Sequence, residues 1–227
     1  NARSASLLAG KQVTAIPNPI DTRIFRPCDK TEARMNLSLP QDKRLILFVS
    51  QRITDRRKGM DYFVEACGKL AAEHPEMCDS TGVVILGGHA EDYEDRLPFT
   101  AYPLGYVSDE KKIVDVYNAV DLFVLPSLED NLPNTIMEAM ACGVPCVGFN
   151  VGGIPEMIDH RKNGYVAEYR NSSDLAAGMA WTLENDGYAG LCENAVRKVA
   201  ASYSQQSVAL RYIEVYNQAI AYRHYKI

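Results

Sequence analysis

Two carboxylates, Asp130 and Glu138, flank a polar loop that leads from an apolar run into a short helical pattern. The apolar run is Asp121–Leu125, the helical pattern covers about Thr135–Cys142, and a second apolar run follows at Pro145–Gly148. This order predicts a βαβ unit, in which ligands bind where strand C-termini meet helix N-termini. Helix N-termini present free N–H groups that suit phosphate and negatively polarised oxygens. The loop is therefore predicted to belong to a ligand site, where carboxylates can accept hydrogen bonds from vicinal hydroxyls.

A second group of candidate residues is cationic. Arg52 follows an apolar run, and Arg56-Arg57-Lys58-Gly59 opens the helical pattern Lys58–Glu73. Two cations beside a helix N-terminus suit a diphosphate. A solvated basic turn is the alternative, but its position at a strand C-terminus, on the same edge as the Asp130 loop, favours a site. The sequence has no Asp-x-Asp motif, so an anionic leaving group would rely on these side chains rather than on Mg²⁺.

Glu138 lies one turn into its predicted helix. Helical periodicity places it about 200° around from Ile136 and Met140, so it should not point into the same core. A lone Glu at this position could simply interact with the helix dipole. Its pairing with Asp130 across the loop favours a role in binding.

Composition and missing motifs exclude several classes of protein. The net charge of −5 gives no reason to expect nucleic acid as a partner, and no apolar run is long enough to span a bilayer. The Gly-x-Gly-x-x-Gly, Gly-x4-Gly-Lys-Ser/Thr and Gly-x-Ser-x-Gly motifs are absent from the sequence. The six cysteines show no Cys-x2-Cys pair, and none of the four histidines has metal-ligand spacing. Core thiols fit a reducing cytoplasm.

Strands alternate with helices along the chain, which predicts an α/β fold with a Rossmann-like, doubly wound parallel sheet and a C-terminal helical extension. The predicted strands are Val13–Ile16, Arg44–Ser50, Gly82–Leu86, Tyr102–Leu104, Asp121–Leu125, Pro145–Gly148 and Gly164–Ala167. The predicted helices are Thr31–Leu37, Lys58–Glu73, Asp109–Asn118, Thr135–Cys142, Pro155–Ile158, Ser173–Glu184, Tyr188–Ser202 and Ser204–Tyr222.

Several short motifs occur in a fixed order over nearly the whole chain. They are Ile16–Asp21, Phe48–Arg52 leading to Lys58-Gly59, Ile85–Gly88, Leu104–Val107, Pro126–Val147, Gly152-Gly153 and Asn163-Gly164. In this order and spacing they resemble the C-terminal, donor-binding domain of GT-B glycosyltransferases, specifically the retaining group-1 (family four) class. Each motif is weak alone, and the set is specific.

The resemblance implies a role for each candidate residue. Arg52 and Lys58 would bind the nucleotide diphosphate and stabilise its charge as the glycosidic bond breaks. Asp130 would contact the donor sugar, and Glu138 would hold the ribose hydroxyls. The loop Asn131, Leu132, Pro133, Asn134 and Thr135 would face sugar and phosphate with its backbone amides. Tyr106 and Val107 would cradle the base, and Gly87 is the last predicted donor-binding residue. No cofactor and no metal ion would be required.

Two positions depart from the family pattern. Asp130 stands where the family usually carries Glu, and Asn131-Leu-Pro-Asn replaces the common Gly-Phe-Gly-Leu. Asp-Asn-Leu-Pro-Asn occurs among polysaccharide-assembly transferases, so we interpret it as a subgroup trait. The donor sugar is left open.

The resemblance also implies a domain organisation. Residues 1–20 would end the N-terminal domain and form the hinge, residues 21–203 would be the nucleotide-sugar-binding domain, and residues 204–227 would form a crossover helix. The acceptor-binding N-terminal domain would be missing from this fragment. The apolar stripe of the last helix, with Val208 and Tyr212, is therefore expected to be partly exposed or covered by a second copy.

The sequence thus predicts the donor half of a hexosyltransferase that uses a nucleotide diphosphate sugar and a glycan or lipid-linked acceptor, in polysaccharide biosynthesis. We expect the fragment alone to bind nucleotide but to transfer little. A cytoplasmic location is expected, with peripheral membrane association possible for the full-length protein. A GT-B-fold nucleotide-sugar epimerase and a non-catalytic nucleotide-binding domain stay open as alternatives.

Overall fold

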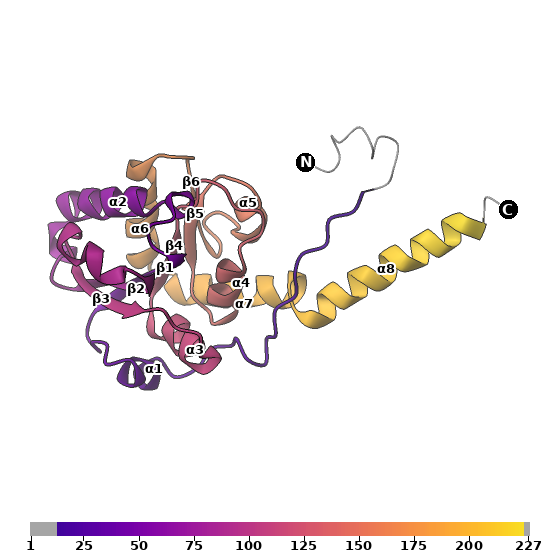
Figure 1. Cartoon of the computed structure of the whole chain (residues 1–227), viewed down its shortest axis with the longest axis horizontal. Coiled ribbons are helices and arrows are strands. Elements are labelled where there is room, and N and C mark those ends of the chain that lie inside the picture. The colour runs from indigo at the N-terminus through magenta and orange to yellow at the C-terminus, as the bar shows by residue number, and fades with distance from the viewer. Residues whose placement is uncertain (1–12, 225–227) are drawn as a thin grey trace.

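The centre of the molecule is a six-stranded parallel sheet in the order β3-β2-β1-β4-β5-β6 (Figure 1). The computed structural model describes residues 13–224 of the chain. The strands are β1 (Arg44–Arg52), β2 (Thr81–Gly88), β3 (Thr100–Gly105), β4 (Leu122–Leu125), β5 (Cys146–Phe149) and β6 (Gly164–Ala167). Strand order reverses between β1 and β4, the position where ligands bind in sheets of this kind. The predicted doubly wound α/β fold is confirmed.

Helices cover both faces of the sheet (Figure 1). They are α1 (Lys30–Asn36), α2 (Met60–Glu73), α3 (Glu110–Ala119), α4 (Asn134–Ala141), α5 (Ile154–Met157), α6 (Ser172–Leu183), α7 (Tyr188–Ser202) and α8 (Gln205–His224), with 3₁₀ turns η3 (Arg56–Lys58), η4 (Pro75–Met77) and η5 (Ala90–Arg96). Helices α2 and α6 pack together on one face, while α1, α3, α4 and α7 lie on the other.

Side chains of β1 alternate between two apolar cores. Leu45 and Leu47 belong to the core under α1, α3 and α4. Ile46 and Phe48 belong to the core under α2 and α6. A strand that is buried on both faces appears in the sequence as a continuous apolar run, which is why this strand could be predicted.

The predicted strand at Val13–Ile16 is wrong. Residues 13–19 form no regular element, and Ile20 forms an isolated β-bridge to Ser204. The N–H of Ile20 donates to the carbonyl of Tyr203 (2.8 Å), and Gln205 donates back to Ile20 (3.2 Å). The segment therefore ends against the start of α8 rather than in the sheet. The predicted domain boundaries remain predictions, and residues 1–12 and 225–227 lie outside the described part.

Helix α8 runs away from the body of the molecule (Figure 1). Val208 is buried where the helix starts, but Tyr212 is 43% exposed. Leu210, Ile213, Tyr216 and Ile220 are also exposed. The expectation of a partly exposed apolar stripe is confirmed. Within the described residues, no helix combines the length and the hydropathy that a bilayer crossing requires.

A buried carboxylate joins four elements at the N-terminal edge of the sheet. Asp121, only 3% exposed, accepts hydrogen bonds from Lys30 Nζ (2.8 Å), Arg34 Nη2 (2.9 Å) and the backbone N–H of Leu45 (2.7 Å). Its backbone carbonyl accepts a hydrogen bond from the hydroxyl of Tyr188 on α7 (2.7 Å). The side chain of Arg34 is 5% exposed, so Asp121 is the counter-charge that makes its burial tolerable.

We expect Asp121→Asn to lower the free energy of unfolding by about 3–5 kcal/mol, because it leaves the buried guanidinium of Arg34 without a counter-charge. Urea unfolding followed by circular dichroism measures this loss. Asp61→Asn is the control, since Asp61 is 73% exposed in its ion pair with Arg96, and it should cost less than about 1 kcal/mol. Equal losses in the two variants would contradict the role given to Asp121.

Candidate functional site

A cationic cleft lies at the C-terminal end of β1. It has a volume of about 570 Å³. Its lining residues are Ser50, Gln51, Arg52, Thr54, Asp55, Arg57 and Lys58. Arg57 is paired with Asp55 (2.8 Å), whereas the side chain of Arg52 makes no ion pair or hydrogen bond with the described residues. The structure thus brings Arg52 and Lys58 together in one cleft, as predicted.

Lys58 contacts the loop that follows β4. Its ammonium group lies 2.7 Å from Oδ2 of Asp130, and the hydroxyl of Ser127 donates to the same oxygen (3.2 Å). The pair is only partly exposed, 30% at Lys58 and 15% at Asp130. An ammonium has three donors, so Lys58 can hold Asp130 and still donate to a second anion. Ser127 was not among the predicted residues.

The sequence suggested that Lys58 is the first residue of a long helix, and this prediction is wrong. Lys58 ends η3, and Gly59 then turns with φ 75° before α2 begins at Met60. A Cβ on Gly59 would lie 1.9 Å from the carbonyl oxygen of Pro126, so only glycine allows this contact. The β1 and β4 loops touch there through their backbones, which positions Lys58 beside Asp130.

The start of α4 has the features of an anion site. Its N-cap is Pro133, which makes no side-chain cap, and its first turn holds no acidic residue. The hydroxyl of Thr135 is buried and has no hydrogen-bond partner among the described residues. Helices α1 and α3, in contrast, are capped by the carboxylates of Asp29 and Asp109. Helix α4 therefore offers free N–H groups and an unsatisfied hydroxyl at the predicted phosphate position.

Glu138 lines a separate cavity of about 210 Å³. The cavity lies between α4, the start of α3 and residues 19–25, and its lining residues are Pro19, Ile20, Asp21, Ile24, Phe25, Glu110, Asn134, Met137 and Glu138. The hydroxyl of Tyr117 donates to Oε2 of Glu138 (2.8 Å). Glu138 is half-buried at the edge of the core rather than inside it, as its helical position predicted.

Burial raises the pKa of Glu138 above its ordinary value of 4.5, and the hydrogen bond from Tyr117 opposes part of this rise. No cation lines the cavity: Asp21 and Glu110 are its other ionisable residues. An ionised Glu138 is therefore surrounded by acids and neutral groups. Such an environment favours uncharged hydroxyl donors over anions.

The other predicted donor-binding residues lie on the same edge of the sheet. Tyr106 follows β3 and is 65% exposed, and Val107 packs against the core. Asn131 and Asn134 are exposed, Leu132 is half-buried and Pro133 is buried. Gly87 is the last residue but one of β2, and a Cβ there would lie 1.8 Å from the carbonyl oxygen of Ser50. Its observed role is close packing of β2 on β1, and its contact with a donor stays a prediction.

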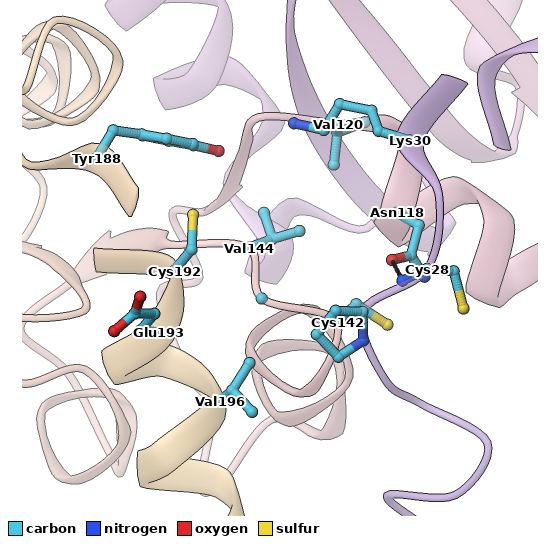
Figure 2. Close-up of a pocket in the computed structure, with 12 residues that line it drawn as sticks. Cys28, Lys30, Asn118, Val120, Cys142, Val144, Tyr188, Cys192, Glu193 and Val196 are labelled. Carbon is cyan, nitrogen blue, oxygen red and sulfur yellow. Dashed lines mark hydrogen bonds between the residues drawn. The ribbon is translucent and has the colours of Figure 1, made fainter. Parts of the chain in front are cut away.

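Another pocket, of about 320 Å³, lies on the opposite edge of the sheet (Figure 2). Val120 and Val144, which precede β4 and β5, line it together with Cys28, Cys142 and Cys192. The amide of Asn118 is already bonded to the backbone of Cys28, Arg26 and Val114. The polar groups are thus engaged within the protein. We interpret this pocket as a seam between α7 and the segments that follow α3 and α4.

One group of possible metal ligands occurs among the described residues. Atoms of His74, Glu76 and Glu184 lie within 4.8 Å of one another. The three residues follow the C-terminal ends of α2 and α6, on the edge of the sheet opposite the cationic cleft. Sequence spacing gave no sign of this group, because Glu184 is distant in the chain. It does not belong to the site.

Comparison with known proteins identifies the family. The model of the glycosyl transferases group 1 matches residues 43–185. The chain belongs to this family. It is 30% identical to a D-inositol 3-phosphate glycosyltransferase of Thermobispora bispora in an alignment of 226 positions that covers 94% of this chain and 52% of the relative. The chain thus spans about half the length of the curated relatives it matches.

Solved structures share the fold. The sucrose-phosphate synthase of Thermosynechococcus elongatus matches with a TM-score of 0.75 at 25% identity, over 92% of this chain and 53% of that protein. Anabaena HepE, solved in complex with UDP and glucose, matches with a TM-score of 0.73 at 20% identity, over 93% of this chain and 59% of that protein. The Rossmann-like fold and the group 1 family are therefore those that the sequence motifs predicted.

We expect Glu138→Gln to raise the free energy of unfolding by about 0.5–1 kcal/mol at neutral pH, a size common among stabilising substitutions. Glutamine keeps an acceptor for Tyr117 and avoids the cost of a half-buried charge. Because the folded-state pKa of Glu138 lies above 4.5, wild-type Glu138 is protonated at low pH and this cost disappears. Urea unfolding from about pH 7 to about pH 4 should therefore show the difference between the two proteins closing.

A Gln variant that is less stable than wild type near neutral pH would contradict this account. So would a stability difference that does not change as the pH falls.

Proposed function

We propose that this chain is the donor-binding half of a retaining glycosyltransferase that takes a hexosyl group from a nucleotide diphosphate sugar. The observation that carries the proposal is the distribution of charge at the C-terminal edge of the sheet, where strand order reverses between β1 and β4. Cations gather at one end of this region and acids at the other. Lys58 and Arg52 stand at one end, and Glu138 opens on an acidic cavity at the other. A nucleotide diphosphate has the matching division, with anionic phosphates next to a neutral ribose diol.

The diphosphate is assigned to the cationic end. Arg52 has no other partner among the described residues, and Lys58 is held in place by Asp130 at 2.7 Å. The free N–H groups and the unsatisfied hydroxyl of Thr135 at the start of α4 lie at the far side of the same loop. As the bond to the sugar breaks, negative charge develops on the leaving diphosphate, and these groups would stabilise it. We propose that these side chains do so without a metal ion or cofactor.

The neutral parts of the donor are assigned to the remaining groups. Glu138 would accept from the ribose hydroxyls, and Asp130 with the loop Asn131–Thr135 would contact the sugar. The exposed ring of Tyr106, together with Val107, would lie by the base. Support for a nucleotide donor comes from Anabaena HepE, which shares the fold and was solved with UDP and glucose.

The acceptor is assigned to a partner domain. The Thermobispora relative is about twice as long as the matched region, since this chain covers 52% of it. We propose that an N-terminal domain of the same protein binds a glycan or lipid-linked acceptor and packs on the exposed side chains of α8. The proposed setting is polysaccharide assembly in the cytoplasm, with peripheral membrane association of the longer protein. The six free cysteines fit a reducing compartment.

We expect the chain to bind UDP or GDP in calorimetric titrations, and Arg52→Ala with Lys58→Ala to weaken that binding about 100-fold or more. Each lost charge-assisted contact is worth roughly 1.5–3 kcal/mol, and each 1.4 kcal/mol is about tenfold in affinity. Affinity should also fall as salt is added, because the contacts are ionic.

The matched control is Lys69→Ala with Arg197→Ala, which removes two cations from exposed ion pairs on α2 and α7. It should leave the affinity within about twofold of wild type, since distant exposed charges are screened. Absence of binding with both nucleotides would overturn the proposal. Binding that survives loss of Arg52 and Lys58 would overturn the assignment of the diphosphate.

A further inference from the structure

A buried tyrosine holds one oxygen of Glu138. Tyr117 on α3 is 1% exposed. Its ring meets Phe25 and Phe123 edge to face, with ring centroids 6.4 Å and 6.1 Å away. Aromatic packing on two sides leaves the ring little freedom to move. The phenol hydroxyl therefore has a fixed position, 2.8 Å from Oε2 of Glu138.

The other oxygen of Glu138 has no such partner. Among the described residues, none donates a hydrogen bond to Oε1, and Glu138 lines the cavity of about 210 Å³. The other ionisable residues of that cavity, Asp21 and Glu110, are acids and cannot pair with it. Asp21 is moreover engaged by Arg23, whose Nε lies 2.9 Å from Oδ1. Oε1 is thus available to an uncharged donor that enters the cavity.

We propose that Tyr117 is a positioning residue that fixes the carboxylate of Glu138, so that Oε1 accepts hydrogen bonds from the ribose hydroxyls of the donor nucleotide. The inference rests on the proposed function, and it adds a residue outside the predicted site. A carboxylate that is anchored at one oxygen loses less side-chain freedom when a ligand binds. Tyr117 would therefore favour ribonucleotides over nucleotides that lack the ribose hydroxyls.

A purely structural role for Tyr117 predicts a different effect on nucleotide affinity. If the hydroxyl only satisfied a buried polar group, its removal would loosen the fold and weaken every nucleotide by the same factor. A positioning role affects the ribose contact alone. The ratio of affinities for a ribonucleotide and its dideoxy analogue separates the two roles.

The experiment compares wild type, Tyr117→Phe and Tyr188→Phe by calorimetric titration with UDP and with 2′,3′-dideoxy-UDP, and with the same pair of guanosine nucleotides. Phenylalanine keeps the ring that packs on Phe25 and Phe123. Tyr188 is the matched control because its hydroxyl also donates to a protein oxygen, the carbonyl of Asp121, on the opposite edge of the sheet. Circular dichroism is used to check that each variant is folded.

We expect wild type to prefer the ribonucleotide, and Tyr117→Phe to reduce that preference roughly threefold to tenfold, the contribution of one hydrogen bond. The affinity of Tyr117→Phe for the dideoxy nucleotide should stay within about twofold of wild type, because its diphosphate contacts are intact. Tyr188→Phe should match wild type with both ligands.

Two results would overturn the inference while leaving the proposed function in place. One is an unchanged ribose preference in Tyr117→Phe, and the other is an equal loss of affinity for both nucleotides. If wild type binds none of the nucleotides, the proposed function fails and this inference fails with it.

Discussion

Backbone-to-backbone contact between neighbouring loops at the C-terminal edge of the sheet is the constraint on which the site depends. Gly59 lies against the carbonyl of Pro126, where a Cβ would come within 1.9 Å of the oxygen. Gly152 meets the carbonyl of Asp130 in the same way, and a Cβ there would come within 1.6 Å. Both glycines have positive φ values, 75° and 57°. The loop that begins at Pro126 is therefore held from two sides, and Asp130 can reach Lys58.

The same arrangement separates charges of opposite sign. Lys58 and Arg52 come from the end of β1, whereas Glu138 is carried one turn into α4 and faces Asp21 and Glu110. Strand order reverses between β1 and β4, which is where ligands bind in sheets of this kind. A ligand that spans both ends must itself be anionic at one end and rich in neutral hydroxyls at the other. This requirement underlies the proposed nucleotide-sugar donor.

Much of this could be predicted from the sequence because it depends on local patterns. The apolar run of β1 and the periodicity of α7, predicted at Tyr188–Ser202 with the bounds that the structure gives, are encoded by consecutive residues. The predicted strand at Val13–Ile16 is wrong because an apolar run alone does not decide whether a segment joins the sheet, and residues 13–19 form no regular element. The helix predicted from Lys58 begins two residues later, at Met60, because Gly59 adopts a left-handed conformation and packs against the distant Pro126.

Two residues that sequence reasoning missed, Tyr117 and Asp121, act through distant partners. Tyr117 lies on the apolar face of α3, where a buried tyrosine fills the core in most proteins, and only folding brings its hydroxyl to Glu138. Asp121 begins an apolar run, and its partners Lys30, Arg34 and Leu45 lie 91, 87 and 76 positions away in the chain. Periodicity and local motifs do not contain such pairings.

The central claim is that one nucleotide diphosphate spans the cationic and acidic ends of the site. A crystal structure of this chain with UDP or GDP tests it most directly. The account predicts phosphate oxygens within hydrogen-bond distance of Lys58 and the N-terminus of α4, and a ribose hydroxyl on Glu138. A nucleotide bound in the apolar pocket on the opposite edge, or bound with its phosphates toward Glu138, would contradict it.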